Sequence, residues 1–217
     1  MKPRANENSC YGIILLAAGS SRRMGATNKL LTALPIGPSE SLLLRSAKQV
    51  LHNLNRGYHD GLQGYLSVVT GYAHCDVQRE LNPLSVECDY NPCSESGMAS
   101  SLQVGLQSLC KQAGFANKHL DFIIVCLADM PHVRSETIAQ IINARLRDTN
   151  RDFIVPVFND QRGNPVLIGH AFFDAMKQLS GDVGARKLIQ ENPVSTFELR
   201  VSDPGVLKDY DLPSDFD

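Results

Sequence analysis

The chain has 217 residues, of which 43% are hydrophobic and 20% are charged, and its formal net charge is −2. This length is enough for one large domain with a buried core, and the small net charge gives no sign of nucleic-acid or membrane-surface binding. Because no apolar run approaches the roughly 20 residues that cross a bilayer, and residues 1–12 lack the apolar segment of a secretory signal, we expect a cytoplasmic protein.

Strands and helices alternate through the first 150 residues. The apolar runs at 11–18 and 121–131 are typical of strands covered on both faces. The pattern predicts further strands at 65–71 and 84–90, and helices at 39–53, 73–82, 98–112 and 135–147. This alternation predicts a parallel α/β sheet, in which ligands bind beyond the C-terminal ends of the strands.

The order of elements changes after residue 150. Two short strands, at 152–158 and 164–169, flank a polar turn. Helices at about 170–178 and 183–190 follow, and then a last strand at 195–201 and a polar C-terminal segment.

The loop after the first strand combines small residues with positive charge. Its small residues can turn backbone N–H groups toward an anion, and its basic residues can bind phosphate oxygens. The small residues are Gly19, Ser20 and Ser21, and the basic residues are Arg22, Arg23 and Lys29. The loop has neither the P-loop pattern nor the G-x-G-x-x-G pattern. From the residues alone, a triphosphate cradle and a solvated turn are equally good interpretations.

Asp129 ends the second apolar run, at the edge of the sheet where ligands are expected. Carboxylates and phosphate oxygens are the usual ligands of Mg²⁺, so Asp129 is a candidate metal ligand. The alternative is a cap on the helix that follows, but Ser135 could take that role. Asp209 and Asp211 are the candidates for a second ligand, and an ordinary acidic tail is the alternative.

Other polar positions admit two interpretations each. Gly71 follows a strand, so the chain can turn tightly there against a flat base. Ser100 and Ser101 lie near a helix start, where they can meet a polar ligand or simply cap the helix. Asp182 and Arg186 have the i, i+4 spacing of a helix salt bridge. The spacing of histidines and cysteines predicts no zinc site.

Residues 16–25 carry the pattern L-A-A-G-x-S-x-R-M-G, which resembles the opening motif of the MobA-like nucleotidyltransferases. It is most similar to the branch of molybdenum cofactor cytidylyltransferases (MocA-like). Later segments resemble further motifs of the family, in the family's order: residues 70–72, 91–106, 127–131, 162–169, 180–186 and 203–213. Two departures stand out, because Lys29 lies one residue farther from the Met-Gly pair than is usual, and Glu95 is displaced by one place.

The resemblance implies one Rossmann-like domain over residues 1–217, a three-layer α/β sandwich with a mostly parallel sheet. Residues 11–131 would bind the nucleotide and residues 132–217 the acceptor. The implied nucleotide-binding residues are Leu16, Ala17, Ala18, Gly19, Ser20, Ser21, Arg23, Lys29, Thr70, Gly71, Ser100 and Ser101. The implied acceptor-binding residues are Gly163, Pro165 and Asp182. Arg22 falls at a variable position of the motif and would face water.

The reaction implied by the resemblance is transfer of CMP from CTP to molybdenum-bound molybdopterin, which gives molybdopterin cytosine dinucleotide and pyrophosphate. Lys29, Arg23 and Asp129 would be catalytic, and Asp129 with Asp211 would hold Mg²⁺. The segment "LAAG" in place of the guanylyl branch's "LAGG" favours cytidylyl transfer, because Ala18 would narrow the slot for the base.

Three alternatives stay open from the sequence. A guanylyltransferase of the same family and a cytidylyltransferase for a sugar or isoprenoid phosphate are close to the favoured reaction. A protein that only binds nucleotide or cofactor, and carries it to a molybdoenzyme, belongs to another class. The presence of both Lys29 and Asp129 argues against that carrier, because a pure binder need not keep both.

Overall fold

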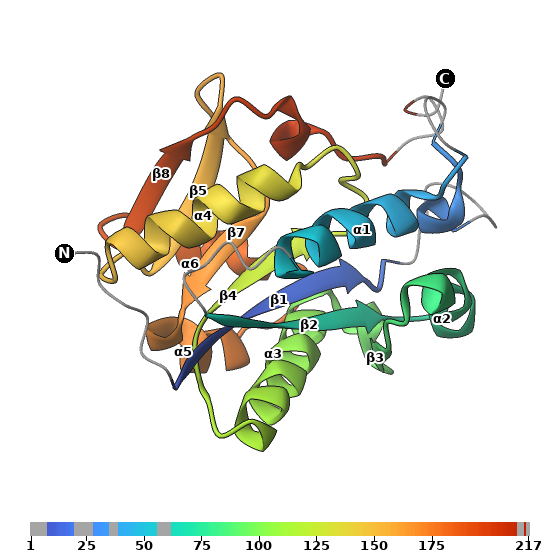
Figure 1. The fold of residues 1–217 in the computed structure, drawn as a ribbon, viewed down its shortest axis with the longest axis horizontal. Coiled ribbons are helices and arrows are strands. Elements are labelled where there is room, and N and C mark those ends of the chain that lie inside the picture. The colour runs from blue at the N-terminus through green and yellow to red at the C-terminus, as the bar shows by residue number, and fades with distance from the viewer. Residues whose placement is uncertain (1–7, 20–27, 35–38, 56–61, 212–214, 216–217) are drawn as a thin grey trace.

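The structure is a computed structural model that describes residues 8–19, 28–34, 39–55, 62–211 and 215 (Figure 1). Its strands are β1 (Ser9–Ala17), β2 (Gln63–Thr70), β3 (Cys88–Tyr90), β4 (His119–Leu127), β5 (Phe153–Phe158), β6 (Gln161–Arg162), β7 (Val166–Gly169) and β8 (Thr196–Arg200). Its α-helices are α1 (Leu42–Asn55), α2 (His74–Leu81), α3 (Met98–Phe115), α4 (Ser135–Arg147), α5 (Phe173–Lys177) and α6 (Gly184–Glu191).

The strands of the described residues form one mixed sheet. β3, β2, β1 and β4 lie side by side in parallel. β7 is antiparallel to β4 and to β5, and β8 is parallel to β5 on its other side. The mostly parallel α/β sheet predicted from the sequence is therefore confirmed. Because β1 to β4 all run the same way, the loops that follow them meet at one edge of the sheet.

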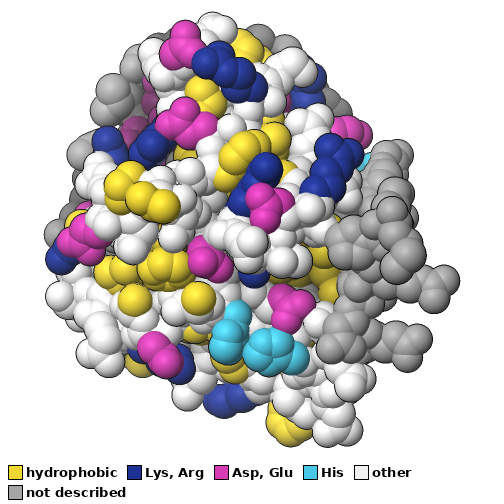
Figure 2. Space-filling model, turned by 90° about the vertical axis from the view of Figure 1, so that its left-hand side faces the viewer, with side chains coloured by type: hydrophobic (Ala, Val, Ile, Leu, Met, Phe, Trp, Pro, Cys, Tyr) yellow, Lys and Arg dark blue, Asp and Glu magenta, His cyan; other side chains and the backbone are white. Residues whose placement is uncertain are grey.

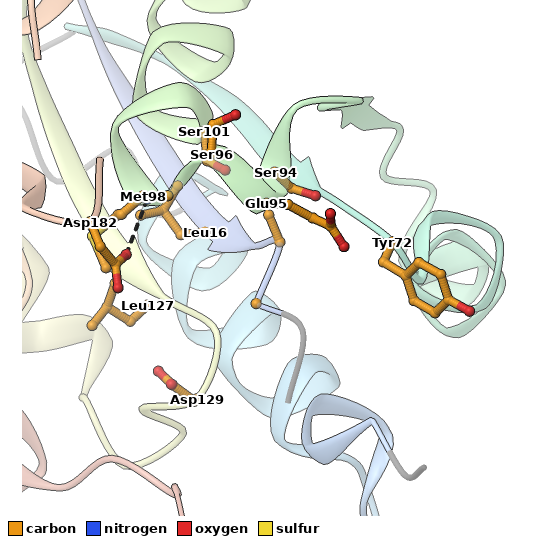
Figure 3. A pocket seen from close by; sticks show the side chains of 13 residues that line it. Leu16, Tyr72, Ser94, Glu95, Ser96, Met98, Ser101, Leu127, Asp129 and Asp182 are labelled. Atoms are coloured by element: carbon orange, nitrogen blue, oxygen red, sulfur yellow. Dashed lines mark hydrogen bonds between the residues drawn. The ribbon is translucent and has the colours of Figure 1, made fainter. Parts of the chain in front are cut away.

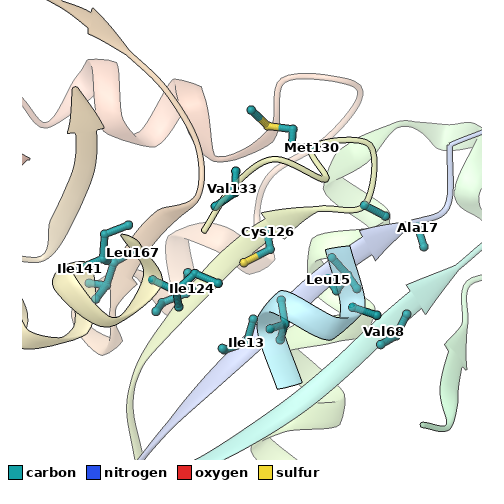
Figure 4. Close-up of a cluster of buried hydrophobic side chains, with 14 of the residues drawn as sticks. Ile13, Leu15, Ala17, Val68, Ile124, Cys126, Met130, Val133, Ile141 and Leu167 are labelled. Atoms are coloured by element: carbon teal, nitrogen blue, oxygen red, sulfur yellow. The ribbon is translucent and has the colours of Figure 1, made fainter. Parts of the chain in front are cut away.

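Hydrophobic side chains of β1 and β4 alternate between two cores, one on each face of the sheet. Ile13 and Ile124 belong to the core that also contains side chains of α1 and α4 (Figure 4). Ile14 and Ile123 belong to the core that contains side chains of α3, α5 and α6. The result is a three-layer arrangement, with α1 and α4 over one face and α3, α5 and α6 over the other (Figure 1).

Two predicted elements are interrupted by 3₁₀ turns in the structure. The strand expected at 84–90 contains only β3, because Pro83 lies in a 3₁₀ turn and Ser85 has a φ of 54°, which a strand cannot accommodate. The helix expected at 170–178 consists of a 3₁₀ turn at His170–Phe172 followed by α5. The helix predicted at 135–147 has these bounds in the structure.

The edge where β1 and β4 begin has a mixed surface. Figure 2 shows acidic and basic side chains interspersed there with hydrophobic ones. His119 and His170 lie together on this side, with ring centroids 4.6 Å apart. Among the described residues, no helix has the length and apolar character needed to span a bilayer.

Candidate active site

A cleft of about 460 Å³, here called the first cleft, opens at the C-terminal ends of the parallel strands (Figure 3). Each strand-end loop contributes to its lining: Leu16, Ala18 and Gly19 at the end of β1, Tyr72 after β2, residues 94–98 after β3, and Leu127 and Asp129 at the end of β4. Ser101 of α3 and Asp182 complete the lining. The first cleft therefore lies where the parallel sheet predicts a ligand site.

Gly71 allows the loops of three strands to pack together beside the first cleft. A Cβ atom at this position would lie 2.6 Å from Oγ of Ser94 and 2.7 Å from the carbonyl oxygen of Ala18. Any larger residue would push these loops apart. The glycine thus has a packing role in the structure, and its predicted contact with a base stays a prediction.

The start of α3 is capped by a segment from the second half of the chain. The backbone N–H of Met98 donates to Oδ1 of Asp182 at 3.2 Å, and the N–H of Ala99 donates to the Gly181 carbonyl at 3.1 Å (Figure 3). Gly97 permits this approach, because its φ is 104° and a Cβ there would lie 2.4 Å from the Gly181 carbonyl carbon. Asp182 precedes α6 and is not part of it, and its carboxylate bonds to the start of α3 and lines the first cleft.

Ser100 and Ser101 connect α3 to the loop that precedes it. Nδ2 of Asn91 donates to both hydroxyl oxygens, at 2.9 Å to Ser100 and 3.0 Å to Ser101. The Ser100 hydroxyl in turn lies 2.9 Å from the Cys93 carbonyl oxygen, to which it can donate. Neither serine caps the helix, since the cap residue is Gly97. Only Ser101 lines the first cleft.

Lys29, Asp129 and Asp211, here called the Lys29 cluster, meet at the edge of the first cleft. Nζ of Lys29 donates to Oδ2 of Asp129 at 2.8 Å and to Oδ1 of Asp211 at 2.5 Å. The backbone N–H of Tyr210 donates to the Asp129 carbonyl at 3.1 Å, which fixes the C-terminal segment beside this loop. The structure thus brings together three predicted site residues that lie far apart in the sequence.

The charges of the Lys29 cluster act on each other's protonation. Burial alone would lower the pKa of Lys29, but Asp129 and then Asp211 outweigh this effect and raise the pKa above its ordinary value. Lys29 is therefore a cation throughout the neutral pH range. Burial and the nearby charge of Asp211, with a further contribution from Asp129, raise the pKa of Asp209. Asp209 thus lies in the field of the cluster, and Asp211 is the carboxylate that Lys29 contacts.

One oxygen of the Lys29 cluster suits a divalent cation. Oδ1 of Asp129 is buried and has no hydrogen-bond partner among the described residues. A buried carboxylate oxygen normally has a partner, and Mg²⁺ is commonly held by one or two carboxylates together with substrate phosphates and water. The described residues contain no group of three or more His, Cys, Asp or Glu side chains that could hold a metal. Asp129 and Asp211 therefore fit a metal that shares its coordination with a substrate.

Asp129 is free for this role because a distant residue caps the following helix. Oδ2 of Asp203 accepts from the Arg134 N–H at 2.9 Å and from Oγ1 of Thr137 at 2.6 Å. Oε1 of Gln49 accepts from the Ser135 N–H at 3.1 Å. The suggestion that Ser135 itself caps α4 was therefore wrong, because a carboxylate from the C-terminal segment satisfies the start of the helix.

Most of the remaining predicted residues either fall outside the described part of the chain or are buried. Ser20, Ser21, Arg22 and Arg23 fall outside the described residues. Ala17 is buried, and the buried Thr70 has its hydroxyl 2.7 Å from Nδ1 of His74, so neither lines the first cleft.

Gly163 and Pro165 lie away from the first cleft. The N–H of Gly163 donates to the Pro156 carbonyl at 2.8 Å, and Pro165 lines a small internal cavity beside α1. Of the three predicted acceptor-binding residues, only Asp182 is therefore in the first cleft. The predicted roles of Gly163 and Pro165 stay predictions.

Several residues that line the first cleft were not among the predicted site residues. Tyr72 stands at one end of the cleft with 88% of its surface exposed, and Glu95 and Met98 lie between it and Asp182 (Figure 3). Their segments resemble motifs of the family, but the motifs give no chemical reason to select these side chains. Their position just after strand ends is the signal that could have identified them.

Comparison with known proteins identifies the family. The MobA-like NTP transferase domain matches residues 13–196. The chain belongs to this family. Over 212 residues it is 27% identical to the purine catabolism protein PucB of Bacillus subtilis (strain 168), and the match covers 94% of this chain and 93% of that relative. This MobA-like chain is therefore a nucleotidyltransferase.

Solved structures share the fold. Rv0371c from Mycobacterium tuberculosis H37Rv superposes with a TM-score of 0.73 at 25% identity, and the match covers 96% of each chain. Its complex with manganese has a TM-score of 0.69 at 22% identity, again over 96% of each chain. The 4-diphosphocytidyl-2C-methyl-D-erythritol synthase from Anaerococcus prevotii DSM 20548 has a TM-score of 0.67 at 13% identity, covering 98% of this chain and 96% of that one. The last likeness is one of fold.

Proposed function

We propose that this MobA-like nucleotidyltransferase moves CMP from CTP to molybdenum-bound molybdopterin and releases pyrophosphate. The observation that carries the proposal is the Lys29 cluster, a cation between two carboxylates at the edge of the first cleft. Transfer to a phosphate needs positioning and charge neutralisation more than a covalent nucleophile on the protein. The cluster places a cation, which can bind phosphate oxygens, beside two carboxylates, which can hold a metal ion.

In the proposed reaction a phosphate oxygen of the acceptor attacks the α-phosphorus of CTP, and the bond from that phosphorus to pyrophosphate breaks. The backbone from Ala18 to Ser21, together with Arg23 and Lys29, would hold the triphosphate. Lys29 keeps its proton at neutral pH, because the two carboxylates raise its pKa. It would therefore act as a fixed hydrogen-bond donor to phosphate oxygens and not as a general acid.

The carboxylates of Asp129 and Asp211 would hold Mg²⁺. When bound, the ion neutralises phosphate oxygens and favours the departure of pyrophosphate. The unpartnered Oδ1 of Asp129 supports this role, and Lys29 holds the two carboxylates near each other. A relative of known structure has been seen with manganese, which is consistent with a divalent ion in this family.

The preference for cytosine rests on Ala18. This residue lines the first cleft, and its methyl group would leave less room for a purine than a glycine would. We expect Ala18→Gly to raise turnover with GTP relative to CTP. The acceptor side rests on Asp182, whose carboxylate lies in the cleft on the far side from Tyr72 (Figure 3). A molybdoenzyme would receive the finished cofactor.

A pyrophosphate-release assay with CTP, GTP and ATP, each with and without the molybdopterin acceptor, tests the proposal. We expect release with CTP that depends on both acceptor and Mg²⁺, and a product with the mass of the cytosine dinucleotide. Faster release with GTP would make the protein a guanylyltransferase. Tight cofactor binding with no release from any nucleotide would favour the carrier.

A further inference from the structure

A second cleft, of about 400 Å³, opens on the side of α1 and has no role in the proposed reaction. Arg45 and Gln49 of α1 line it, together with the loop after β4 and the segment around Lys208. The same two segments also carry Asp129 and Asp211, so the Lys29 cluster lies next to both clefts. Met98 and Ser101 of α3 line the first cleft, and α3 lies on the opposite face of the sheet from α1 (Figure 1).

Cations dominate the second cleft. Arg45, Arg134 and Lys208 all line it, and the acidic side chain among its lining residues is Asp203. That carboxylate is 3% exposed, and both of its oxygens already accept hydrogen bonds from the protein, from Gly205 N–H at 3.0 Å and from the start of α4. The Arg134 Nε is 3.8 Å away from it, which is too far for a hydrogen bond.

Arg45 has a donor without a partner. Its Nη1 contacts Oε1 of Glu40 at 3.3 Å, but its Nε is buried and makes no hydrogen bond with any described residue. Leaving a buried N–H unpaired is unfavourable, and such groups normally have a partner. An acceptor oxygen in the second cleft would supply one.

The effect of nearby charges on the pKa of His132 indicates the sign of the electrostatic potential in the second cleft. Burial lowers its pKa, and the charges of Lys208 and Arg45 lower it further, against the opposite effect of Asp203. The two cations therefore outweigh the carboxylate at the position of the ring. The complement of this field is an anion.

We propose that the second cleft binds a phosphate group, independently of the nucleotide, with Arg45, Arg134 and Lys208 as its ligands. Arginine presents a planar fork that matches phosphate oxygens, and lysine adds a point charge. Asp203 and the Glu40 carboxylate that pairs with Arg45 offset part of this charge, and the three cations still leave the second cleft net positive. Two guanidinium groups and an ammonium group also offer enough donors for the several oxygens of a phosphate. The ligand is either free phosphate or a phosphate monoester, and binding requires neither CTP nor Mg²⁺.

An NMR titration of the full-length, ¹⁵N-labelled protein locates the binding. Inorganic phosphate and glycerol phosphate are added separately at constant ionic strength, without nucleotide or divalent metal. We expect saturable shifts of the amides of Arg134, Gly205 and Lys208. Shifts confined to Gly19 and Gly97 would assign phosphate to the first cleft and overturn the proposal, as would linear shifts that chloride reproduces. Whichever of the two ligands binds with the higher affinity identifies the natural ligand as free phosphate or as a phosphate monoester.

Variants test the three cations. The double variant Arg134→Gln and Lys208→Gln should weaken phosphate binding by roughly tenfold or more, since it removes two charge-assisted contacts. The matched control, Lys187→Gln with Arg200→Gln, removes the same charge from exposed ion pairs elsewhere and should bind like the wild type. Arg45→Lys keeps the charge but removes Nε, so we expect severalfold weaker binding in a folded protein.

Unchanged binding in the double variant, or equal loss in the control, would contradict the second site. Either result leaves the proposed CTP reaction untouched, because these residues do not line the first cleft. Conversely, a protein that binds phosphate here but releases no pyrophosphate from CTP would refute only the proposed function.

Discussion

Among the described residues, two clefts near the C-terminal ends of the strands are lined by side chains of opposite charge. The first contains the carboxylates of Glu95, Asp129 and Asp182, whereas the second contains Arg45 and Lys208 with a further arginine. The loop after β4 contributes to both, with Asp129 in the first cleft and His132 and Arg134 in the second. A triphosphate entering the first cleft would meet these carboxylates, so it needs cations such as Lys29, which lies at the edge of the cleft. The second cleft can take an anion directly.

This difference explains why an anionic ligand needs Lys29 and a metal ion in the first cleft but not in the second. Lys29 reaches the first cleft from the loop after β1, and it bridges Asp129 and Asp211. A divalent ion on the same carboxylates would complete the neutralisation. We therefore expect the first cleft to depend on metal and the second to be independent of it.

The largest effect should come from Asp129→Ala. Loss of this carboxylate removes both the partner of Lys29 and the metal ligand, so Mg²⁺-dependent pyrophosphate release should fall at least about a hundredfold. Pyrophosphate release by the isosteric variant Asp129→Asn should fall by a comparable factor. Asp174→Asn, an exposed carboxylate distant from the cleft, is the control and should retain full activity. Normal turnover in Asp129→Ala would refute the assigned role.

Removal of divalent metal should separate the two clefts. With EDTA, pyrophosphate release should cease and return on addition of Mg²⁺, whereas phosphate binding in the second cleft should keep its affinity. The two measurements are the release assay and the amide titration. Turnover that persists in EDTA would contradict the metal role of Asp129 and Asp211.

The sequence predicted the frame of the fold well, for a physical reason. The runs at 11–18 and 121–131 are continuously apolar because β1 and β4 are covered on both faces. A strand with one face in water would alternate apolar and polar residues, so the pattern predicts buried strands. The strand end selected Asp129, and the family resemblance selected Asp211 as the second carboxylate. No local spacing could have placed Lys29 between them.

The details of the clefts were beyond the sequence, because they depend on contacts between distant segments. Local spacing suggested Ser135 as the cap of α4, but Asp203 reaches that position from the far end of the chain. Tyr72 lines the first cleft next to Gly71, which packs against the Ala18 carbonyl from another strand end. The positive charge of the second cleft likewise arises from three separate segments.

Asp203→Asn should destabilise the start of α4 beside the second cleft. This buried carboxylate accepts hydrogen bonds from Arg134, Thr137 and Gly205, and an amide can accept at only one of its two terminal atoms. We expect the free energy of unfolding to fall by about 1–3 kcal/mol, measured by chemical denaturation. Asp160→Asn, an exposed partner of Arg200, should change it little. Equal stabilities of the two variants would contradict the capping role.

Tyr72→Ala should affect only the first cleft. An exposed aromatic ring at the end of a nucleotide cleft can stack on a base, and such stacking is worth about 1–3 kcal/mol. We expect the KM for CTP to rise about tenfold with little change in kcat, and Tyr72→Phe to retain the wild-type KM. Phe115→Ala, an exposed ring at the end of α3, is the control. An unchanged KM in Tyr72→Ala would exclude stacking.

The smallest effect concerns Asp209, which lies between Lys208 of the second cleft and the Lys29 cluster. Its pKa is raised, so the folded protein binds this proton more tightly than the unfolded chain. The stability that this gives is full below pH 3.8, the ordinary value, and is lost as the pH rises through the raised pKa. At neutral pH the ionised group therefore opposes folding slightly. Asp209→Asn should raise the Tm a little at pH 7 and not at pH 3.

The same variant tests which carboxylate holds the metal with Asp129. If Asp211 is the second ligand, Asp211→Asn should raise the Mg²⁺ concentration needed for half-maximal turnover, whereas Asp209→Asn should leave it nearly unchanged. The contact with Lys29 favours Asp211, because a carboxylate already directed at the cluster needs no rearrangement to reach an ion beside Asp129. The opposite result would make Asp209 the ligand and would leave Asp211 as a partner of Lys29 alone.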